Sequence, residues 1–507
     1  MVQFWDDIEL DRESDRPLYQ QLEARITAFI DDGRLPPGAK LPASRDLATK
    51  LGINRNTVTS AYEALSKKAR VHSHVGQGTF VVEETPKRAP TMRWSFSRAT
   101  LAAREWVRSP AEETRHPDPI DFASLVPDEK LFPVEPFRVV LDEVLTQQGQ
   151  KLLQYGPAAG YPPLRAYIAE RLARRGVHTT SDNVLVVNGS QQALDLICRT
   201  LLDPGDPVVL ESPTYTIVLP LLAQYQAAIE EIPMTPRGMD LDVLEATLQR
   251  SRPKFLFTMP TFHNPTGITM DLASRERLVA IAGSHGVPVV EDDFDSELRF
   301  DGEALPPLKA LDDQDCVIHI GTFSKGLFPG LRLGWIVAPP DIFDALSRAK
   351  LISDYHTSLL LQAAVLTFCS RGHYDTHLER LARIYRDKSR TLVAALERYF
   401  PEGVTWTEPE GGFAFWITLP EAESADAVLA EAKNDGVVFT PGAHFFARGE
   451  GRRFFRLSIS RVPVERIEEG VKRLGNVLER RLTRAGGPDR NDKKGAGVRE
   501  QEPALHI

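Results

Sequence analysis

Short apolar runs alternate with stretches of helical periodicity across the greater part of this chain. The runs are NVLVVNG, DPVVLES, KFLFTMP, VPVVEDD and CVIHIGTF. Each has the length and composition of a strand, and the stretches between them have the pattern of helices. Such alternation predicts a mainly parallel sheet with helices on both faces, so we expect residues 120–482 to form an α/β unit. In an open sheet of this kind, ligands bind beyond the carboxyl ends of the strands.

A lysine stands just beyond the end of the last of these strands. Lys325 lies in GTFSKGLFPGLRLG, directly after CVIHIGTF. A lysine in this place can reach the aldehyde of a buried cofactor and hold it as a Schiff base, as for pyridoxal phosphate (PLP). Asp292, near the end of VPVVEDD, can pair with a protonated pyridine nitrogen and so make the ring an electron sink. Lys325 and Asp292 are therefore the expected catalytic residues.

Other strand ends supply the remaining groups that PLP needs. Asn264, in PTFHNPTG, can donate to the phenolic O3′ of the ring, and Tyr215, in ESPTY, can stack on its face. The phosphate needs donors and positive charge, which a helix N-terminus and nearby polar side chains provide. The residues expected around the phosphate are Ser190, Gln191, Thr322 and Arg332.

The N-terminal part of the chain has a different pattern. Apolar residues at helical spacing after Pro17 predict an amphipathic helix that ends near Gly33. Two short helices follow: SRDLATKL, which Ser44 can cap, and RNTVTSAYEALSKK, which Asn54 can cap. Two helices around the tight turn at Gly52 indicate a helix-turn-helix. The β-prone runs VHSHV and TFVV that come next indicate a hairpin, the wing.

This N-terminal region carries an excess of positive charge within an acidic chain. The whole protein has a formal net charge of −9, but residues 34–82 contain eight Lys and Arg against Asp46 and Glu63. Phosphate neutralisation supplies much of the affinity for DNA, so we expect this region to bind a double-stranded operator. Polar side chains near helix N-termini can reach phosphates or base edges, and glycines let a wing approach the minor groove. The expected contacts are Arg45, Asn54, Arg55, Asn56, Thr57, Gly76 and Gly78.

These patterns predict a multidomain chain. We expect a winged helix-turn-helix of α+β class at residues 12–83, a linker at 84–119, the PLP unit at 120–482 and a disordered tail at 483–507. The chain starts without a basic region and apolar core, and it has no apolar run long enough for a membrane, so we expect a cytoplasmic protein. Three widely spaced cysteines without a CxxC pair indicate neither a disulfide framework nor a metal site.

The quoted motifs resemble two known families. The run from PLYQQLEARI to SAYEAL, with the later VGQGTFV, resembles the winged helix-turn-helix of the GntR family. Residues 120–482 look like a fold-type I aminotransferase of class I/II, and the joined arrangement resembles the MocR subgroup of GntR regulators. The resemblance implies a head-to-tail homodimer and a substrate carboxylate bound by Arg456. It also implies that Tyr155 reaches the cofactor phosphate of the neighbouring subunit.

Two positions depart from these families. A glycine is common near Ala69, and a tyrosine that donates to O3′ usually stands near Phe294. Neither Phe294 nor Asp295 is expected to donate to that oxygen. The loss of one hydrogen bond to a charged oxygen costs about 1.5 to 3 kcal/mol. We therefore expect Asn264 to carry more of this work, and transamination to be slower than in a dedicated enzyme.

The resemblance implies a PLP-dependent transcriptional regulator. It would sense an amino compound that forms an external aldimine with the cofactor in place of Lys325. Two alternatives stay open. The chain can be an active PLP-dependent aminotransferase, because the expected catalytic set is complete, or a regulator whose effector is PLP itself.

Overall fold

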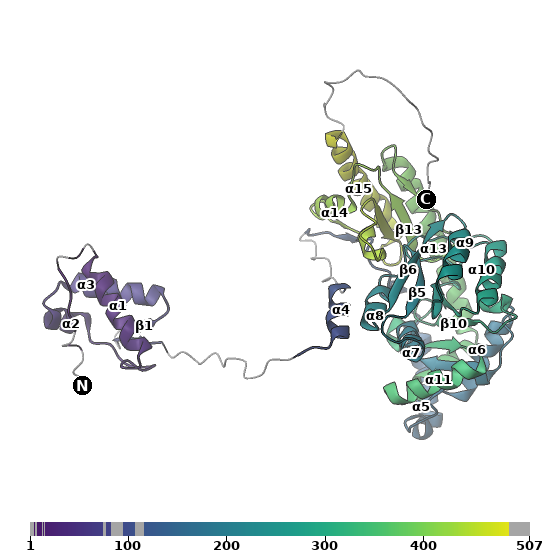
Figure 1. Ribbon diagram of the computed structural model, residues 1–507, viewed down its shortest axis with the longest axis horizontal. Coiled ribbons are helices and arrows are strands. Elements are labelled where there is room, and N and C mark those ends of the chain that lie inside the picture. The colour runs from purple at the N-terminus through teal and green to yellow at the C-terminus, as the bar shows by residue number, and fades with distance from the viewer. Residues whose placement is uncertain are drawn as a thin grey trace, which may run out of the picture. The chain divides into compact units, whose positions relative to one another are not determined.

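The computed structural model describes residues 5, 8–12, 14, 16–74, 78–82, 95–106 and 116–485 of the 507-residue chain. The chain forms two compact units, residues 1–95 and residues 96–507 (Figure 1). Every helix within the described ranges is too short or too polar to span a membrane.

The smaller unit consists of three helices followed by a two-stranded hairpin. Apolar side chains at helical spacing, among them Leu22, Ile26 and Leu65, are fully buried in its core. The hairpin is antiparallel and pairs Val71 with Val81, and both side chains join the same core. The predicted winged helix-turn-helix fold is thus confirmed. Its elements are α1 (Leu18–Asp31), α2 (Ser44–Leu51), α3 (Arg55–Lys67), β1 (Val71–His74) and β2 (Gly78–Val81).

The two short helices start in different ways. The side chain of Asn54 accepts a hydrogen bond from the backbone N–H of Asn56 at 2.8 Å, which confirms Asn54 as the cap of α3. Ser44 is not a cap, because it is the first helical residue of α2 and Ala43 occupies the capping position without a side-chain bond. The prediction for Ser44 is wrong by one residue, since sequence signals locate a helix end only to within a residue or two.

Ala69 leaves α3 in an unfavourable backbone conformation. Its φ of 53° lies in the left-handed region, where a side chain with a Cβ atom costs roughly 1–2 kcal/mol. The N–H of Arg70 still donates to the carbonyl of Leu65 at 2.9 Å, so the turn is closed by a hydrogen bond. A glycine at this position would adopt the same turn without the steric cost.

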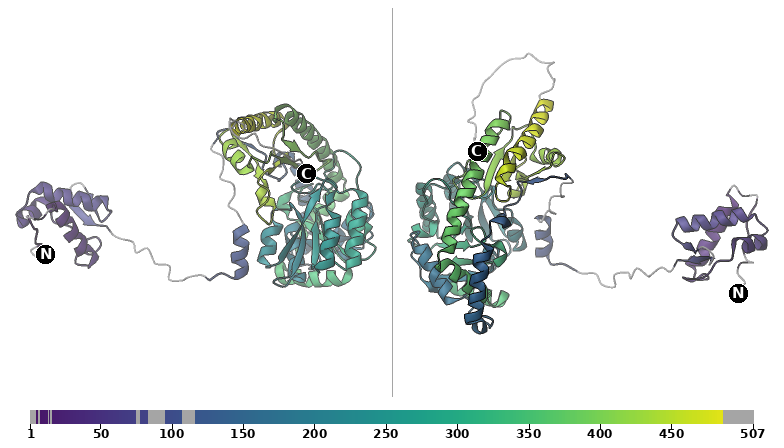
Figure 2. Two further views of the ribbon diagram at one scale, coloured as in Figure 1. Left: turned by 45° about the horizontal axis from the view of Figure 1, so that its top comes forward. Right: turned by 180° about the vertical axis from the view of Figure 1, so that it is seen from behind.

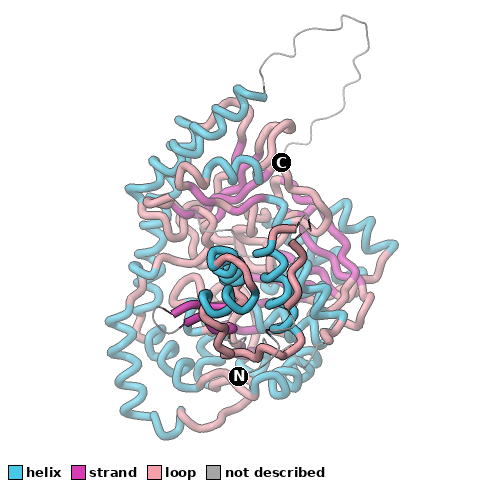
Figure 3. Tube along the Cα trace, turned by 90° about the vertical axis from the view of Figure 1, so that its left-hand side faces the viewer, coloured by secondary structure: helices cyan, strands magenta, loops and turns pink. Residues whose placement is uncertain are grey.

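The larger unit is built on an eight-stranded sheet with strand order β4-β11-β10-β9-β8-β5-β6-β7. The central strands pair in parallel, whereas β11 and β7 run antiparallel to their neighbours. The mainly parallel sheet predicted from the alternating pattern is therefore confirmed. Figure 3 shows strands in magenta among helices in cyan. The strands are β4 (Val184–Val187), β5 (Pro207–Ser212), β6 (Ala228–Thr235), β7 (Gly238–Met239), β8 (Phe255–Thr258), β9 (Val289–Asp293), β10 (Val317–Thr322) and β11 (Gly334–Val337).

Successive residues of one strand reach opposite faces of this sheet. Val184 and Val186 of β4 pack with the helices on one face, and Leu185 and Val187 pack with those on the other. Both faces are buried, as is usual for a parallel sheet. One face carries α5 (Val134–Leu152), α6 (Pro162–Ala173), α9 (Leu241–Arg250), α10 (Leu272–His285) and α12 (Leu359–Ser370), and the other carries α7 (Ser190–Leu201), α8 (Val218–Gln224) and α11 (Pro340–Asp354).

A smaller sheet with strand order β12-β13-β16-β15 forms the C-terminal part of this unit. It packs with helices around a core that includes Phe415, Ile417 and Leu457. Figure 2 shows the green to yellow helices of this part beside the sheet. The start of the unit joins this part, because β3 (Ile120–Asp121) pairs in parallel with β14 (Val437–Val438). The other elements are α13 (His373–Tyr399), β12 (Thr405–Trp406), β13 (Ala414–Thr418), α14 (Ala425–Ala432), β15 (Thr440–Pro441), β16 (Phe454–Ser458) and α15 (Val464–Ala485).

One helix lies in the segment for which the sequence predicts a linker. This helix, α4 (Arg98–Trp106), belongs to the larger unit and packs beside α8 (Figures 1 and 2). The backbone N–H of Thr100 donates to the hydroxyl of Ser97 at 3.1 Å, which stabilises its first turn. Trp106, at its end, packs against the apolar core beneath α7 and α8.

Candidate functional site

Lys325 lies three residues beyond the end of β10, in a turn at the carboxyl edge of the large sheet. Its amine donates a hydrogen bond to the carbonyl of Leu125 at 3.0 Å. Burial lowers the pKa of Lys325 to about 8, and the nearby carboxyl of Asp295 opposes this shift. A lysine with such a pKa is partly neutral near pH 7, and the neutral amine is the form that attacks a carbonyl carbon.

Asp292 lies on β9, whose backbone pairs it with Ile320 of the adjacent β10. Its carboxyl is buried, and its Oδ1 atom has no hydrogen-bond partner among the described residues. Burial, with Asp293 beside it, raises the pKa of Asp292 to about 7. A buried carboxylate oxygen without a donor is costly, so this atom is suited to accept a hydrogen bond from a bound group.

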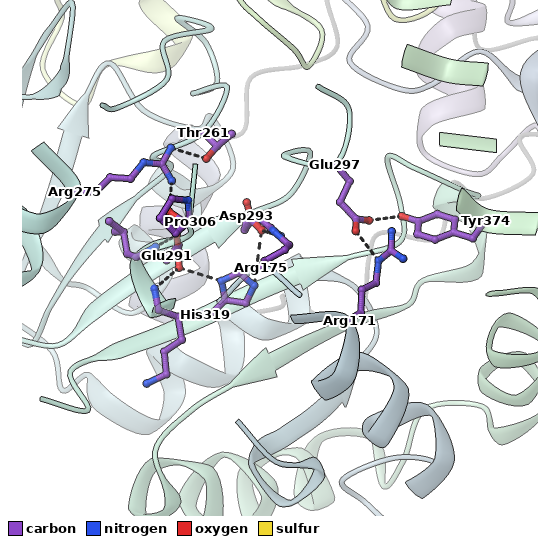
Figure 4. Close-up of polar contacts among 12 residues, drawn as sticks. Arg171, Arg175, Thr261, Arg275, Glu291, Asp293, Glu297, Pro306, His319 and Tyr374 are labelled. Carbon is purple, nitrogen blue, oxygen red and sulfur yellow. Dashed lines mark hydrogen bonds and ion pairs between the residues drawn. The ribbon is translucent and has the colours of Figure 1, made fainter. Parts of the chain in front are cut away.

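The strand neighbours of Asp292 are held by a network of charged groups (Figure 4). Arg175 donates to Asp293 at 2.6 Å, and this guanidinium overcomes the effect of burial and lowers the pKa of Asp293 to about 2. His319 lies 3.0 Å from the carboxylate of Glu291, which also accepts the backbone N–H of Leu308 at 2.6 Å. These bonds fix the two residues on either side of Asp292.

A second group of contacts fixes the loop that carries Asn264. The fully buried guanidinium of Arg275 donates to the hydroxyl of Thr261 at 2.8 Å, to the carbonyl of Pro260 at 2.9 Å and to the carbonyl of Pro306 at 2.9 Å (Figure 4). These bonds tie the chain after β8 to a neighbouring segment. Asn264 therefore lies on a loop that the hydrogen bonds of Arg275 hold in place.

Arg456 reaches the same region from β16 of the smaller sheet. Its guanidinium donates to the side-chain oxygen of Asn264 at 2.9 Å, to the carbonyl of Ala123 at 2.6 Å and to the hydroxyl of Thr440 at 3.2 Å. Burial lowers the pKa of Arg456 to about 10, so the side chain stays charged at neutral pH. Its Nε atom is buried and has no partner among the described residues.

Asp295 is a residue that the sequence prediction set aside. Its carboxyl is buried, its Oδ1 atom has no partner in the described part of the chain, and burial raises its pKa well above the usual value. A neutral carboxyl carries an O–H group that can donate. Whether Asp295 donates to a bound cofactor stays as the sequence analysis expects it, and Phe294 packs its ring in the apolar core. The signal was burial, which a single position in a sequence does not reveal.

The groups expected around a phosphate gather where α7 begins. Gly189 precedes the helix with a φ of 82°, and Ser190 and Gln191 are its first two residues. The guanidinium of Arg332 donates to the carbonyl of Asn188 at 3.1 Å. The φ of Gly189 is one that other residues rarely adopt, and a Cβ atom there would lie 2.5 Å from that guanidinium, so a larger residue would be strained and would displace Arg332.

Thr322 and Tyr215 complete this region in different ways. The hydroxyl of Thr322 bonds to Ser324 and to the carbonyl of Leu333, both at 3.0 Å. Burial raises the pKa of Tyr215 to about 12, and the charges of Asp292, Arg456 and Arg332 act on its hydroxyl. The tyrosine thus lies within electrostatic range of residues from three separate segments.

Tyr155 is not buried in the candidate cofactor site of its own chain. Its side chain is 79% exposed, and its ring lies 5.2 Å from that of Tyr355 and 5.9 Å from that of His356, centre to centre. Leu153 and Ile352 are also large exposed apolar residues of the segments that carry these rings.

The winged unit presents an exposed polar surface along the starts of α2 and α3. Arg45, Arg55 and Asn56 are exposed, and Thr57 is half-buried. The Oδ1 atom of Asn54 is engaged in the helix cap, so only its NH2 group remains for another partner.

The wing is described only in part. Gly78 has a φ of 118° and is exposed, and a Cβ atom there would lie 2.7 Å from the side chain of Lys40. Gly76 lies outside the described residues.

A cavity of about 780 Å³ opens beside Arg456. Trp106 from α4 forms part of its wall, and α4 fits the one short helix for which the sequence of this linker left room. The other lining residues are Thr216, Ile217, Pro220, Asp426, Thr440, Ala443, His444, Phe446, Ala447 and Gly449.

Two family models match the chain. The model of aminotransferase class I and II matches residues 124–474, and that of bacterial regulatory proteins, gntR family, matches residues 18–81. The probable rhizopine catabolism regulatory protein MocR of Rhizobium meliloti is 34% identical over 475 residues, which cover 92% of this chain and 95% of that protein. Similarity therefore extends over both units.

The larger unit is also similar to known enzymes. The 2-aminoadipate transaminase of Thermus thermophilus is 39% identical over 376 residues, which cover 74% of this chain and 93% of the enzyme. The crystal structure of LysN, an alpha-aminoadipate aminotransferase from Thermus thermophilus complexed with N-(5′-phosphopyridoxyl)-L-leucine, is 37% identical with a TM-score of 0.71. That match covers 76% of this chain and 98% of the solved chain.

The cofactor of this family is PLP, and the residues described above fit it. The unpartnered oxygen of Asp292 suits a pyridinium N–H, and the start of α7 beside Arg332 suits a phosphate. The chain belongs to the MocR subgroup of the GntR regulators, in which a winged helix-turn-helix is joined to an aminotransferase class I and II domain.

Proposed function

We propose that this PLP-dependent regulator senses an amino compound at Lys325 and thereby changes its binding to DNA. The observation that carries the proposal is the Lys325 amine, buried near the carboxyls of Asp292 and Asp295, whose Oδ1 atoms have no partner among the described residues. The same chain has a gntR-type DNA-binding unit. PLP, when bound, supplies an electrophilic carbon to which primary amines add and a ring that withdraws electrons. An amine of the right shape can therefore compete with Lys325.

We assign the residues around the ring to separate tasks. Lys325 would hold the cofactor, Asp292 would pair with its ring nitrogen, and Tyr215 would stack on its face. Asn264 would donate to O3′ through its NH2 group, since its oxygen is already bonded to Arg456. The groups assigned to the phosphate are Ser190, Gln191, Thr322 and Arg332.

Arg456 would bind the carboxylate of an incoming amino acid. A guanidinium binds a carboxylate through two parallel hydrogen bonds, and such pairs are strong in a buried place. In the structure its NH2 group is shared between Ala123 and Thr440, so a carboxylate would compete with these neutral oxygens. Because an anion attracts the guanidinium more strongly than a carbonyl does, the exchange favours the ligand.

A homodimer accounts for the position of Tyr155. Its exposed ring and the exposed Leu153, Ile352 and Tyr355 would be covered by a second subunit, because soluble proteins rarely leave large apolar side chains grouped in water. In a head-to-tail dimer, each Tyr155 would reach the phosphate site of the other subunit. Two DNA-binding units per dimer would then meet two half-sites of an operator.

The DNA-binding unit would use the exposed face described above. Arg45 and Arg55 would reach phosphates or base edges, with Asn54, Asn56 and Thr57 as shorter contacts and the glycines of the wing near the minor groove. Sensing requires that the amino compound bind two states of the dimer with different affinity, since equal affinity shifts nothing.

A working aminotransferase is the second candidate, because the transaminase relatives match most of the larger unit. A regulator that responds to PLP itself is the third. One experiment separates them. The visible absorption of the PLP-loaded protein is recorded with a panel of amino acids, while keto-acid release and affinity for an operator selected from random duplexes are followed.

Each outcome selects one candidate. A spectral shift with altered DNA affinity and no keto acid supports the sensor, whereas continuous keto-acid release supports the enzyme. A DNA affinity that changes between PLP-free and PLP-loaded protein, and not with any amino acid, supports PLP as the effector.

A further inference from the structure

The helix α4 lies between the segments that the two family models cover, residues 18–81 and 124–474. It nevertheless packs beside α8 and forms part of the larger unit (Figures 1 and 2). A helix from a connecting segment that docks on the ligand-binding unit is a candidate for a specific role.

The last residue of α4 lines the cavity beside Arg456. Trp106 is half-buried and packs against the apolar core that includes Val218 and Leu219 of α8. Ile217 and Phe446 line the same cavity of about 780 Å³. Arg456 therefore supplies a fixed positive charge on the wall, and the indole and its apolar neighbours supply a surface for hydrocarbon.

We propose that Trp106 is a ligand-contacting residue that gives this pocket its preference for amino acids with an apolar side chain. The carboxylate would bind Arg456, and the side chain would pack on Trp106 and Ile217. Aromatic rings offer a large apolar area with few rotatable bonds, so they discriminate by shape at a low entropic cost. This inference rests on the proposed function, because it takes the cavity as the place where the amino compound is sensed.

The position of Trp106 also gives a route to the DNA-binding unit. A ligand that packs on Trp106 stabilises the docking of α4 beside α8, and α4 belongs to the segment that leads to the smaller unit. Ligand binding would thereby act on this connecting segment through direct contact. The coupling is reciprocal, so DNA binding would change ligand affinity by the same factor.

The test compares L-leucine with L-alanine on the PLP-loaded full-length protein, with the visible absorption band as the readout. We expect L-leucine to bind more tightly, and Trp106→Ala to weaken L-leucine by about tenfold while leaving L-alanine nearly unchanged. Trp106→Phe should retain most of the preference. Leu101→Ala, an exposed residue of the same helix, serves as the matched control and should change neither affinity.

Failure of this inference differs from failure of the proposed function. The unmodified protein is first tested with L-leucine, L-alanine and the rest of a standard amino-acid panel. If no amino acid shifts its visible band or alters its affinity for DNA, the proposed function and the role of Trp106 are both wrong. If the unmodified protein responds but Trp106→Ala binds L-leucine and L-alanine as before, only the role of Trp106 is overturned. An unchanged visible band in Trp106→Ala without amino acid shows that the larger unit has folded.

The coupling is tested with the same variants at saturating L-leucine. We expect the affinity for a selected operator to shift in the unmodified protein and in Leu101→Ala, and to shift several-fold less in Trp106→Ala. A full shift in the saturated Trp106→Ala protein would rule out Trp106 as part of the coupling.

Discussion

The guanidinium of Arg456 donates a hydrogen bond to the side-chain oxygen of Asn264 across 2.9 Å. Arg456 lies on β16 of the smaller sheet, and Asn264 lies in the loop after β8 of the large sheet. Because the amide oxygen accepts this bond, the NH2 group of Asn264 must face the other way. A residue expected to bind substrate thus orients a residue expected to bind the cofactor.

The first prediction concerns this oriented amide. Asn264→Ala removes a donor to a charged oxygen, worth about 1.5 to 3 kcal/mol, and should weaken PLP binding roughly 10- to 150-fold. Absorbance titration of the PLP-free protein measures this affinity. Asn434→Ala changes an exposed asparagine and is the control. An unchanged PLP affinity in Asn264→Ala would contradict the role assigned to the amide.

The pKa of Lys325 predicts how PLP loading depends on pH. Burial lowers that pKa to about 8, and only the neutral amine attacks an aldehyde. The rate at which the visible band grows after PLP is added should therefore rise with pH and level off above about pH 8. Lys325→Ala should give no such band at any pH. A rate that keeps rising to pH 10 would indicate an unperturbed lysine.

The ion pair between the half-buried Arg175 and the buried Asp293 predicts a large loss of stability on mutation. Arg175→Ala leaves the Asp293 carboxylate buried without its partner, which should lower the free energy of unfolding by about 3 to 5 kcal/mol. The neighbouring Arg174 forms an exposed pair with Glu170, so Arg174→Ala should cost about 0.5 kcal/mol or less. Urea denaturation followed by far-UV circular dichroism compares the two. If the two variants lowered the free energy of unfolding equally, the Arg175–Asp293 pair would contribute no more stability than the exposed pair.

The same pair sets a dependence on acid. The folded pKa of Asp293 is lowered to about 2, below its usual value of 3.8, so its contribution is present above pH 3.8 and is lost as pH falls through about 2. The difference in stability between the unmodified protein and Arg175→Ala should therefore narrow as the solution is acidified from pH 5 towards pH 2.

Ala69 predicts a stabilising substitution in the winged unit. Its left-handed backbone suits glycine, so Ala69→Gly should stabilise this unit by about 1 kcal/mol. Ala64→Gly, in the last turn of α3, should destabilise it by a similar amount because glycine is unfavourable within a helix. Hydrogen exchange of the α3 amides in the full-length chain reports both changes. Faster exchange in Ala69→Gly would contradict the argument.

Arg55 predicts a selective loss of DNA binding. It is exposed at the first position of α3, where it can meet a base edge or phosphate. Arg55→Ala should weaken binding to a selected operator by about 1 to 3 kcal/mol and leave the PLP band unchanged. Arg25→Ala makes the same change of charge on the exposed side of α1 and should have a smaller effect. Equal effects of the two variants would mean that net charge alone sets the affinity.

The sequence by itself determined the elements and the local placement of much of the site. Strand and helix periodicity predicted the mainly parallel sheet, and Lys325 and Asp292 lie at the strand ends where they were expected, because periodicity and turn signals are local properties. The cap at Asn54 was also predictable, whereas the cap at Ser44 was misplaced by one residue.

Only the tertiary structure decided which distant groups meet and what burial does to them. It brings Arg456 into hydrogen-bond contact with Asn264 and places Trp106 in the wall of the cavity beside Arg456. It also leaves the Oδ1 atoms of Asp292 and Asp295 without partners among the described residues. Burial also raises the pKa of Asp295, which the sequence analysis did not anticipate. Such a shift comes from the removal of water by segments far away in the chain, and no local pattern encodes that removal.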